Sequence, residues 1–325
     1  MPATVRTCLV TGGSGFIGRG VARSLGERGR EVTVLSRTPV EGLPTVLTEL
    51  GRTPIDLRRE GFQHVYHVAG LAHLVARTEE ERRLFTTVNV EGTRDLLDGL
   101  SRCAERPRTF LLVSTVAVYG VEEGELLDET TPRHAKDPYG LSKRQAEDLV
   151  LEWGERFRVR TAIVRLPLVW GPGAPGNLNR MVRAIAAGRY LSVGRPEVRR
   201  SVVRLADVVE ALPRVEEAGG IFHLTDGYHP RLAELEAALA AALGRRRPWR
   251  LPPLLARAAA GLGDGLGTLT RRRMPFDRAA LSKMASTLTF SDDKARRTLG
   301  WAPTRVLDHV GELVDVPGGR TRAPG

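Results

Sequence analysis

The chain has 325 residues, with 49 lysines and arginines against 38 aspartates and glutamates and a formal net charge of +11. This length allows one large α/β domain and a smaller lobe. The two cysteines, Cys8 and Cys103, have neither the number of a disulfide framework nor the spacing of metal ligands. We therefore expect no metal site and a reducing, cytoplasmic environment.

The first 37 residues predict a strand, a helix and a second strand. An apolar run at residues 8–10 leads into a turn that reads Gly13-x-Gly15-x-x-Gly18, and the second strand covers residues 31–37. These glycines let the backbone turn tightly and approach a pyrophosphate, which the free N–H groups of the helix start would stabilise. Because the first strand begins at once, we expect no signal peptide.

The end of the second strand predicts the cofactor. Folds that prefer NAD place an acidic residue there, which accepts hydrogen bonds from the ribose 2′-hydroxyl. This chain has Ser36 and Arg37 instead, and they can donate to a 2′-phosphate and pair with it. We predict NADP(H) as the preferred cofactor, with NAD(H) possible. An ordinary surface arginine is the alternative interpretation of Arg37.

Tyr139-Gly-Leu-Ser-Lys143 is a candidate catalytic pair. A tyrosine and a lysine four residues apart on a helix lie on one face, one turn from each other. An ammonium placed there can lower the pKa of the phenol, so that it transfers a proton near neutral pH. A surface tyrosine stacked on a lysine is the alternative for this motif alone, and the glycine-rich unit favours catalysis.

These motifs resemble the extended short-chain dehydrogenase/reductase family, which contains nucleotide-sugar epimerases, dehydratases and 4-ketoreductases. The resemblance runs from about residue 8 to residue 301. It implies a Rossmann-type doubly wound parallel sheet with a smaller C-terminal substrate-binding lobe, as the alternation of strands and helices also indicates. Its motifs are 11–18 and 139–143, already quoted, and four others: His67–Ala72, Asn89–Thr93, Leu112–Gly120 and Arg165–Pro172.

The resemblance also assigns residues to a site. Thr115, Tyr139 and Lys143 would be catalytic, with Ser114 as the neighbouring candidate for the Thr115 role. Thr115, Asn177 and Arg200 would contact substrate, the last two through a nucleotide diphosphate. Helix capping is the alternative for Asn177, and an ordinary surface position is the alternative for Arg200. The cofactor would lie on Gly12, Gly13, Gly15, Phe16, Ile17, Gly18, Ser36, Arg37, Ala69, Gly70, Ser114, Tyr139, Lys143 and Pro167.

Two departures from the family pattern affect the cofactor. Family members usually have an aspartate after the third strand that touches adenine. Here Asp56 stands too close to His67, while Glu49 has the better spacing, so this contact stays open between Glu49 and Asp56. The acidic residue expected after the second strand is also missing, which argues against the pattern of an epimerase that retains NAD.

Domain boundaries follow from the same elements. Residues 1–168 would form the dinucleotide-binding domain, with later strands from about 202–225. Residues 169–315 would form mainly the substrate-binding lobe, and residues 316–325 a disordered tail.

The expected function is reduction of a 4-keto sugar carried on a nucleotide, by an NADP(H)-dependent oxidoreductase acting at C4 of the hexose. The alternatives are a UDP-hexose 4-epimerase with tightly held NAD(P), and a reductase or dehydrogenase of a hydrophobic compound such as a sterol. A fourth possibility is a non-catalytic NADP-sensing protein, against which the complete Thr115, Tyr139 and Lys143 set argues. Thr115-Val-Ala replaces the Thr-Asp-Glu of dehydratases and argues against dehydration.

The positive charge raises the question of nucleic-acid or membrane partners. The clusters Arg245–Arg247 and Arg271–Arg273 flank turns and have no evident aromatic partner, so we expect a solvated surface and no nucleic acid. The apolar stretch 251–266 carries Arg257 and Asp264, which predicts no membrane span. The expected partners are a nucleotide sugar and a second copy of the chain in a homodimer.

Overall fold

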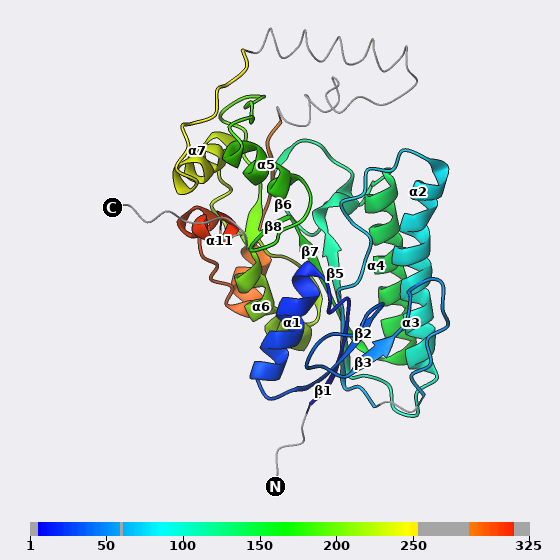
Figure 1. The fold of residues 1–325 in the computed structure, drawn as a ribbon. Coiled ribbons are helices and arrows are strands. Elements are labelled where there is room, and N and C mark those ends of the chain that lie inside the picture. The colour runs from blue at the N-terminus through cyan, green and yellow to red at the C-terminus, as the bar shows by residue number, and fades with distance from the viewer. Residues whose placement is uncertain (1–5, 59–60, 253–285, 315–325) are drawn as a thin grey trace.

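The computed structural model of the protein describes residues 6–58, 61–252 and 286–314. Its centre is a seven-stranded parallel sheet with the order β10-β7-β5-β4-β1-β2-β3 (Figure 1). This confirms the predicted doubly wound parallel sheet. The strands are β1 (Thr7–Thr11), β2 (Glu31–Ser36), β3 (Thr45–Leu47), β4 (His64–His67), β5 (Thr109–Thr115), β7 (Arg160–Leu166) and β10 (Gly220–His223).

Helices cover both faces of this sheet, so its strands are apolar along their length. All seven residues of β5 are buried, as expected for a parallel strand with helices on both sides. One face carries α1 (Phe16–Glu27), α6 (Leu205–Ala218) and α10 (Asp293–Leu299). The other carries α2 (Glu79–Phe85), the π-helical turn η1 (Thr86–Glu91), α3 (Gly92–Ser101) and α4 (Pro138–Phe157) (Figure 1).

A smaller lobe stands at the carboxyl ends of the strands and has a hydrophobic core of its own. Trp170, Leu178 and Leu239 are buried in that core. Its elements are β8 (Leu168–Trp170), α5 (Asn177–Ala186), β9 (Val202–Arg204), α7 (Leu232–Ala242), η3 (Val306–His309) and α11 (Gly311–Val314). Beside it, η2 (Val116–Tyr119) follows β5, and β6 (Gly124–Leu127) pairs with β11 (Leu288–Phe290).

The two parts interleave along the chain. Of the two strands expected within 202–225, β10 joins the main sheet, whereas β9 pairs with β8 in the small lobe. The expected tail at 316–325, the cluster Arg271–Arg273 and most of the apolar stretch 251–266 lie outside the described residues. Within the described part, no helix combines the length and apolarity needed to cross a membrane.

Candidate active site

The turn between β1 and α1 depends on glycine for both its conformation and its packing. Gly12 has a φ of +72°, and a Cβ there would lie 2.8 Å from the Cα of Ala69. A Cβ on Gly18 would lie 2.1 Å from the carbonyl oxygen of Gly12. Gly15 caps α1 without a side-chain bond, and the first turn holds no acidic residue. The positive end of the helix is therefore available to an anion.

Gly13 has a different place from the one we predicted. A Cβ on Gly13 would lie 2.5 Å from Cγ1 of Val34, so this glycine brings α1 against β2. Gly13 does not line the cavity that the neighbouring glycines border. The spacing of the motif predicts that other atoms come close to the backbone of these glycines. It does not predict which glycine packs against the protein and which borders a ligand.

A cavity of about 1160 Å³ opens at the carboxyl ends of the strands. It lies at the end of β1, whose neighbours β2 and β4 stand on opposite sides of it, the position at which doubly wound sheets bind ligands. Most residues assigned from the sequence lie on its wall: Gly12, Gly15, Phe16, Ile17, Gly18, Ser36, Arg37, Ala69, Gly70, Ser114, Thr115, Tyr139, Lys143, Pro167 and Arg200.

A smaller cavity of about 490 Å³ adjoins the end of β2. It is lined by Ser14, Arg37, Thr38, Thr48 and Glu49. Arg37 is exposed and makes no ion pair within the described residues. The buried Oγ1 of Thr48 has no hydrogen-bond partner among them. A guanidinium, three hydroxyl groups and the carboxylate of Glu49 thus line this space, and sequence reasoning missed Thr48.

The choice between the two candidate acids near adenine also depends on this region. Glu49 lines both cavities. Asp56 is exposed, pairs with Arg58 at 2.6 Å and lies on neither cavity. Of the two candidates, only Glu49 is therefore placed to meet a ligand.

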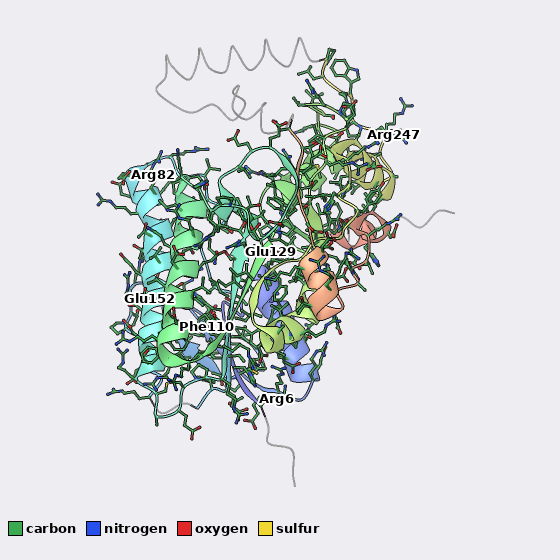
Figure 2. The ribbon with its side chains drawn as sticks, turned by 180° about the vertical axis from the view of Figure 1, so that it is seen from behind. Arg6, Arg82, Phe110, Glu129, Glu152 and Arg247 are labelled. Carbon is green, nitrogen blue, oxygen red and sulfur yellow. The ribbon has the colours of Figure 1, made fainter. Side chains whose placement is uncertain are left out.

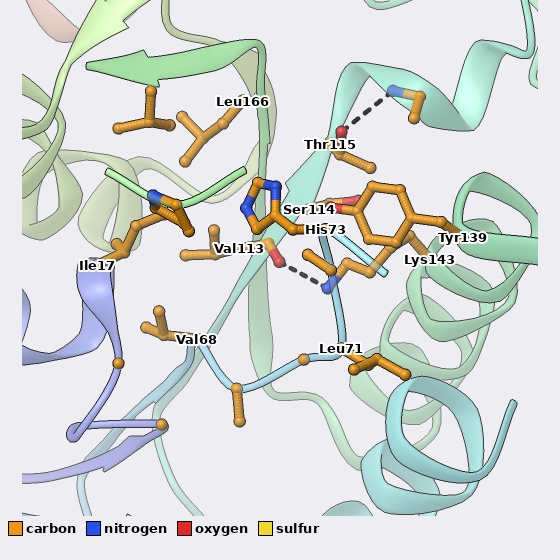
Figure 3. A pocket seen from close by; sticks show the side chains of 18 of the residues that line it. Ile17, Val68, Leu71, His73, Val113, Ser114, Thr115, Tyr139, Lys143 and Leu166 are labelled. Atoms are coloured by element: carbon orange, nitrogen blue, oxygen red, sulfur yellow. Dashed lines mark hydrogen bonds between the residues drawn. The ribbon is translucent and has the colours of Figure 1, made fainter. Parts of the chain in front are cut away.

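Helix α4 brings the predicted catalytic pair to the cavity. The helix begins at Pro138, after Asp137, whose side chain accepts a hydrogen bond from the N–H of Gly140 at 3.0 Å. Lys143 is buried one turn beyond Tyr139, and its Nζ donates to the carbonyl oxygen of Val113 at 2.7 Å (Figure 3). Burial lowers the pKa of Lys143 from 10.5 to about 8, although Glu147 acts in the opposite direction.

Tyr139 points into the cavity from the same face of α4 (Figure 3). Burial raises the pKa of its phenol, and a hydrogen bond with Thr115 acts against that rise. We expected the ammonium of Lys143 to lower the pKa of Tyr139, and that effect stays a prediction, because burial is the largest effect on this pKa in the arrangement seen here. The ammonium is directed to the backbone of β5, because the lysine side chain reaches the strand that α4 packs on.

The two candidate hydroxyl groups at the end of β5 belong to consecutive residues. They point to opposite faces of the sheet, because successive side chains of a strand alternate. Thr115 accepts a hydrogen bond from the N–H of Ala117 at 3.2 Å and interacts with the phenol of Tyr139. Ser114 donates to the fully buried carboxylate of Glu147 at 2.6 Å. The hydroxyl of Ser114 is therefore already engaged, and Thr115 is the one beside Tyr139.

Asn89 connects the cavity wall to α4, a role that its sequence motif did not reveal. Its Oδ1 accepts from the N–H of Leu71 at 2.7 Å, and its Nδ2 donates to Ser142 Oγ at 2.9 Å. Asn89 lies within the π-helical turn η1, an irregularity that is frequent at functional sites. The loop that carries Ala69 and Gly70 is thereby joined to the helix that carries Tyr139.

The two predicted substrate residues have different positions. Arg200 lies on the cavity wall, where it donates to the carbonyl oxygen of Ser286, and burial lowers its pKa. Asn177 is exposed and lies outside the cavity, with its Oδ1 accepting from Arg180. The capping alternative for Asn177 is wrong, since Gly176 holds the cap position. Sequence reasoning also missed polar wall residues for which no motif gave a signal, among them His73, Glu122, His134 and Lys136.

Comparison with known proteins now identifies the family. The sequence profile of the NAD dependent epimerase/dehydratase family matches residues 8–222, more than half of the chain. The chain belongs to this family. It is 27% identical over 318 residues to a UDP-glucose 4-epimerase of Vibrio cholerae, covering 93% of this chain and 92% of that protein.

Two further similarities cover at least 90% of this chain. The chain is 32% identical over 316 residues to the 4-hydroxy-2-methyl-3-oxo-4-farnesyl-3,4-dihydroquinoline-1-oxide ketoreductase of Stigmatella aurantiaca, covering 90% of this chain and 91% of that protein. The structure of the UDP-glucose 4-epimerase of Thermus thermophilus in complex with NAD matches with a TM-score of 0.73 at 25% identity. That match covers 95% of this chain and 98% of the other.

As a member of the epimerase/dehydratase family, the protein is an NAD(P)-dependent enzyme, and the predicted extended short-chain dehydrogenase/reductase relationship is confirmed. The residues present fit such a cofactor. The backbone of Gly12, Gly15 and Gly18 leaves no room for side chains beside an open helix N-terminus. A dinucleotide of the NAD(P) type matches an extended cavity that joins this turn to Tyr139 and Lys143.

Proposed function

We propose that this enzyme is an NADP(H)-dependent oxidoreductase that reduces a 4-keto hexose carried on a nucleotide. The observation that carries the proposal is the small cavity at the end of β2. It offers an exposed guanidinium on Arg37 and the hydroxyls of Ser14, Thr38 and Thr48, next to Ser36, against the single carboxylate of Glu49. A 2′-phosphate needs charge and donors of this kind, whereas a free ribose hydroxyl needs an acceptor.

The reduction combines a hydride with a proton. When bound, NADPH supplies the hydride to the carbonyl carbon, and the carbonyl oxygen needs a proton to become a hydroxyl. Tyr139 gives that proton, and Thr115 donates a hydrogen bond to the same oxygen. Lys143, held one turn away on α4, stabilises the phenolate that remains and would bind the ribose next to the nicotinamide.

The deciding experiment is a product assay. Purified enzyme is mixed with NADPH and a panel of UDP-, GDP- and dTDP-linked 4-keto sugars, and NADPH oxidation is followed by absorbance. NMR of the product then locates the new hydroxyl. NADPH consumption that depends on the keto sugar and yields the 4-hydroxy product supports the proposal. Absence of consumption across the panel would contradict it.

A 4-epimerase is the second candidate, favoured by the Vibrio cholerae relative and by the NAD held in the Thermus thermophilus structure. An epimerase returns the hydride to its substrate, so it needs no external reductant. Incubation with UDP-glucose or UDP-N-acetylglucosamine and no added cofactor distinguishes the two. Steady formation of the C4 epimer in the NMR spectrum would replace our first candidate by the second.

A third candidate, reduction of a hydrophobic ketone, is favoured by the farnesylated substrate in the name of the Stigmatella aurantiaca relative. Apolar residues also line part of the wall near Tyr139, among them Leu71, Val116 and Leu288. Adding prenylated and sterol ketones to the same NADPH assay tests this candidate directly. Turnover of these ketones without turnover of any nucleotide sugar would select it.

Two further expectations accompany this proposal. We infer that the enzyme acts in the cytoplasm, since Cys8 and Cys103 are both buried and neither forms a disulfide within the described residues. A homodimer is the expected assembly, and its mass can be measured by light scattering after gel filtration. A monomeric mass at micromolar concentration would contradict this expectation.

A further inference from the structure

Two chain segments meet on the outer side of the small lobe, far along the sequence from each other. Residues 189–192 follow α5, and residues 245–250 follow α7. An isolated bridge pairs Ser192 with Arg250 in parallel, through hydrogen bonds from the Ser192 N–H to Trp249 and from the Leu251 N–H to Ser192. The bridge therefore sets how the backbones of these two segments lie relative to each other.

The bridge determines which side chains point outward. Ser192 Oγ and Arg250 Nη2 both donate to Glu236 Oε2, at 2.7 and 3.0 Å, and the Glu236 side chain is buried. In extended segments neighbouring side chains alternate between the two sides, so Leu191 and Trp249 lie together on the opposite side. Both are exposed, with 52% and 63% of their surface accessible.

Four arginines lie within four residues of one of these two apolar side chains along the chain. Arg189 precedes Leu191, and Arg245, Arg246 and Arg247 precede Trp249; all four are exposed. None of them forms an ion pair within the described part of the chain, whereas Glu236 is held by Arg250. Figure 2 shows Arg247 on the outer end of the small lobe, far from Phe110 in the central sheet. We call these six residues the arginine–tryptophan face.

The sequence alone suggested that Arg245–Arg247 is a solvated cluster without an aromatic partner. The structure changes that interpretation, because Trp249 stands beside the cluster and the bridge adds Leu191 to it. Trp249 also differs from the other three tryptophans of the chain, Trp153, Trp170 and Trp301, which are all buried. A large aromatic side chain is thus exposed at one place only in the described part of the chain, among unpaired arginines.

We propose that the arginine–tryptophan face docks on a membrane surface containing anionic phospholipid. Tryptophan partitions to the boundary between headgroups and acyl chains, and each arginine near an anionic leaflet contributes about 1 kcal/mol of attraction. Nucleic acid would use the arginines and could stack on Trp249. It has no comparable use for the aliphatic side chain of Leu191 beside it. Docking of this kind goes beyond the proposed reaction and does not depend on it.

The full-length chain carries its own reporter, since Trp249 is the exposed one of its four tryptophans. Tryptophan emission is recorded while the protein is titrated with phosphatidylcholine vesicles, with or without phosphatidylglycerol. We expect a blue shift and protection from acrylamide quenching with the anionic vesicles. Removing three arginines should weaken binding at least about tenfold, since each contributes about 1 kcal/mol.

Matched variants separate this face from general surface properties. Arg245→Gln combined with Arg246→Gln and Arg247→Gln should show this weakening as reduced sedimentation with anionic vesicles. Leu191→Ser should weaken it. The controls are Leu126→Ser, which changes another exposed leucine, and Arg77→Gln with Arg82→Gln and Arg94→Gln, which removes three exposed arginines from the large domain. Both controls should bind as the wild type does.

Three outcomes would overturn the proposal. The first is unchanged Trp249 emission with anionic vesicles at low salt. The second is equal sedimentation of the face variant and the control triple variant. The third is tighter binding of the wild type to double-stranded DNA than to vesicles, measured by competition, which would assign the face to nucleic acid.

Discussion

Lys143 is one of four lysines in the chain, and its environment shows how a single cation is prepared for a site. The ammonium is buried, and its one described hydrogen bond goes to the carbonyl oxygen of Val113. Burial lowers its pKa to about 8, and no carboxylate among the described residues pairs with it directly. Such a cation is free to interact with a phenolate or a ribose.

Replacing Tyr139 should lower turnover without weakening the binding of the cofactor. Tyr139→Phe keeps the ring and removes the proton, so we expect turnover to fall by about 10² or more while the affinity for NADPH changes little. Steady-state turnover and fluorescence titration of NADPH measure the two quantities. Thr115→Val, which removes the neighbouring hydroxyl, should also lower turnover. A Tyr139→Phe variant with wild-type turnover would remove Tyr139 from the mechanism.

Arg37 should determine the preference between cofactors. We expect the wild type to bind NADPH at least about tenfold more tightly than NADH, a difference of roughly 1.4 kcal/mol. Arg37→Ala should remove most of this difference by weakening NADPH binding, since NADH makes no 2′-phosphate contact. Arg23→Ala, another exposed arginine on the adjacent helix α1, is the control. Equal affinities of the wild type for both cofactors would refute this account.

At the scale of elements, α4 attaches to the end of β5 at two consecutive residues. Lys143 donates to the carbonyl of Val113, and Glu147, one turn further, accepts from Ser114. Glu147 is also held by Arg165 of β7 at 2.8 Å, with both side chains buried. These contacts determine how Thr115, the next residue of β5, stands relative to α4.

We therefore expect Ser114→Ala to act through geometry. It removes one buried hydrogen bond, so the free energy of unfolding should fall by about 1 kcal/mol, and turnover should fall while the affinity for NADPH stays constant. Glu147→Gln should be more severe, about 3–5 kcal/mol, because it leaves the buried charge of Arg165 uncompensated. Urea denaturation gives both values. If Ser114→Ala weakened NADPH binding and left turnover intact, Ser114 would instead be a cofactor contact.

At the scale of the whole molecule, two buried histidines in different parts of the sheet link stability to pH. His67 is bonded to Thr11 and Thr93, and burial lowers its pKa to about 3. His223 is bonded to Tyr119 at 2.5 Å, and burial lowers its pKa from 6.5 to about 4. Below pH 6.5 the unfolded chain takes up protons that the folded chain does not, so stability falls as the pH falls.

The expected slope is about 1.4 kcal/mol per pH unit for each histidine between roughly pH 6 and 4.5. Chemical denaturation at several pH values measures it. His223→Gln keeps a hydrogen-bonding side chain and should remove about half of this slope. Burial acts to raise the pKa of Glu216, but its hydrogen bonds lower that pKa to about 2, so this carboxylate adds its own loss only at lower pH. A wild-type stability that is constant from pH 7 to 5 would contradict this prediction.

The sequence by itself determined the features that depend on near neighbours along the chain. The spacing of Gly13, Gly15 and Gly18 indicates a tight turn because the steric reason is local, and Tyr139 and Lys143 share a face because of helix periodicity. The parallel sheet followed from the alternation of apolar runs with helices. For the same reason most of the predicted wall residues do line the large cavity.

Only the tertiary structure decided the features that depend on how distant segments pack. It turned Ser114 towards Glu147 and Thr115 towards Tyr139, placed Gly13 against Val34, and left Asn177 outside the cavity. It also paired Ser192 with Arg250, which brings together the two loops that carry Leu191 and Trp249. No repeating pattern in the sequence predicts these features, because each depends on how segments that are distant along the chain pack together.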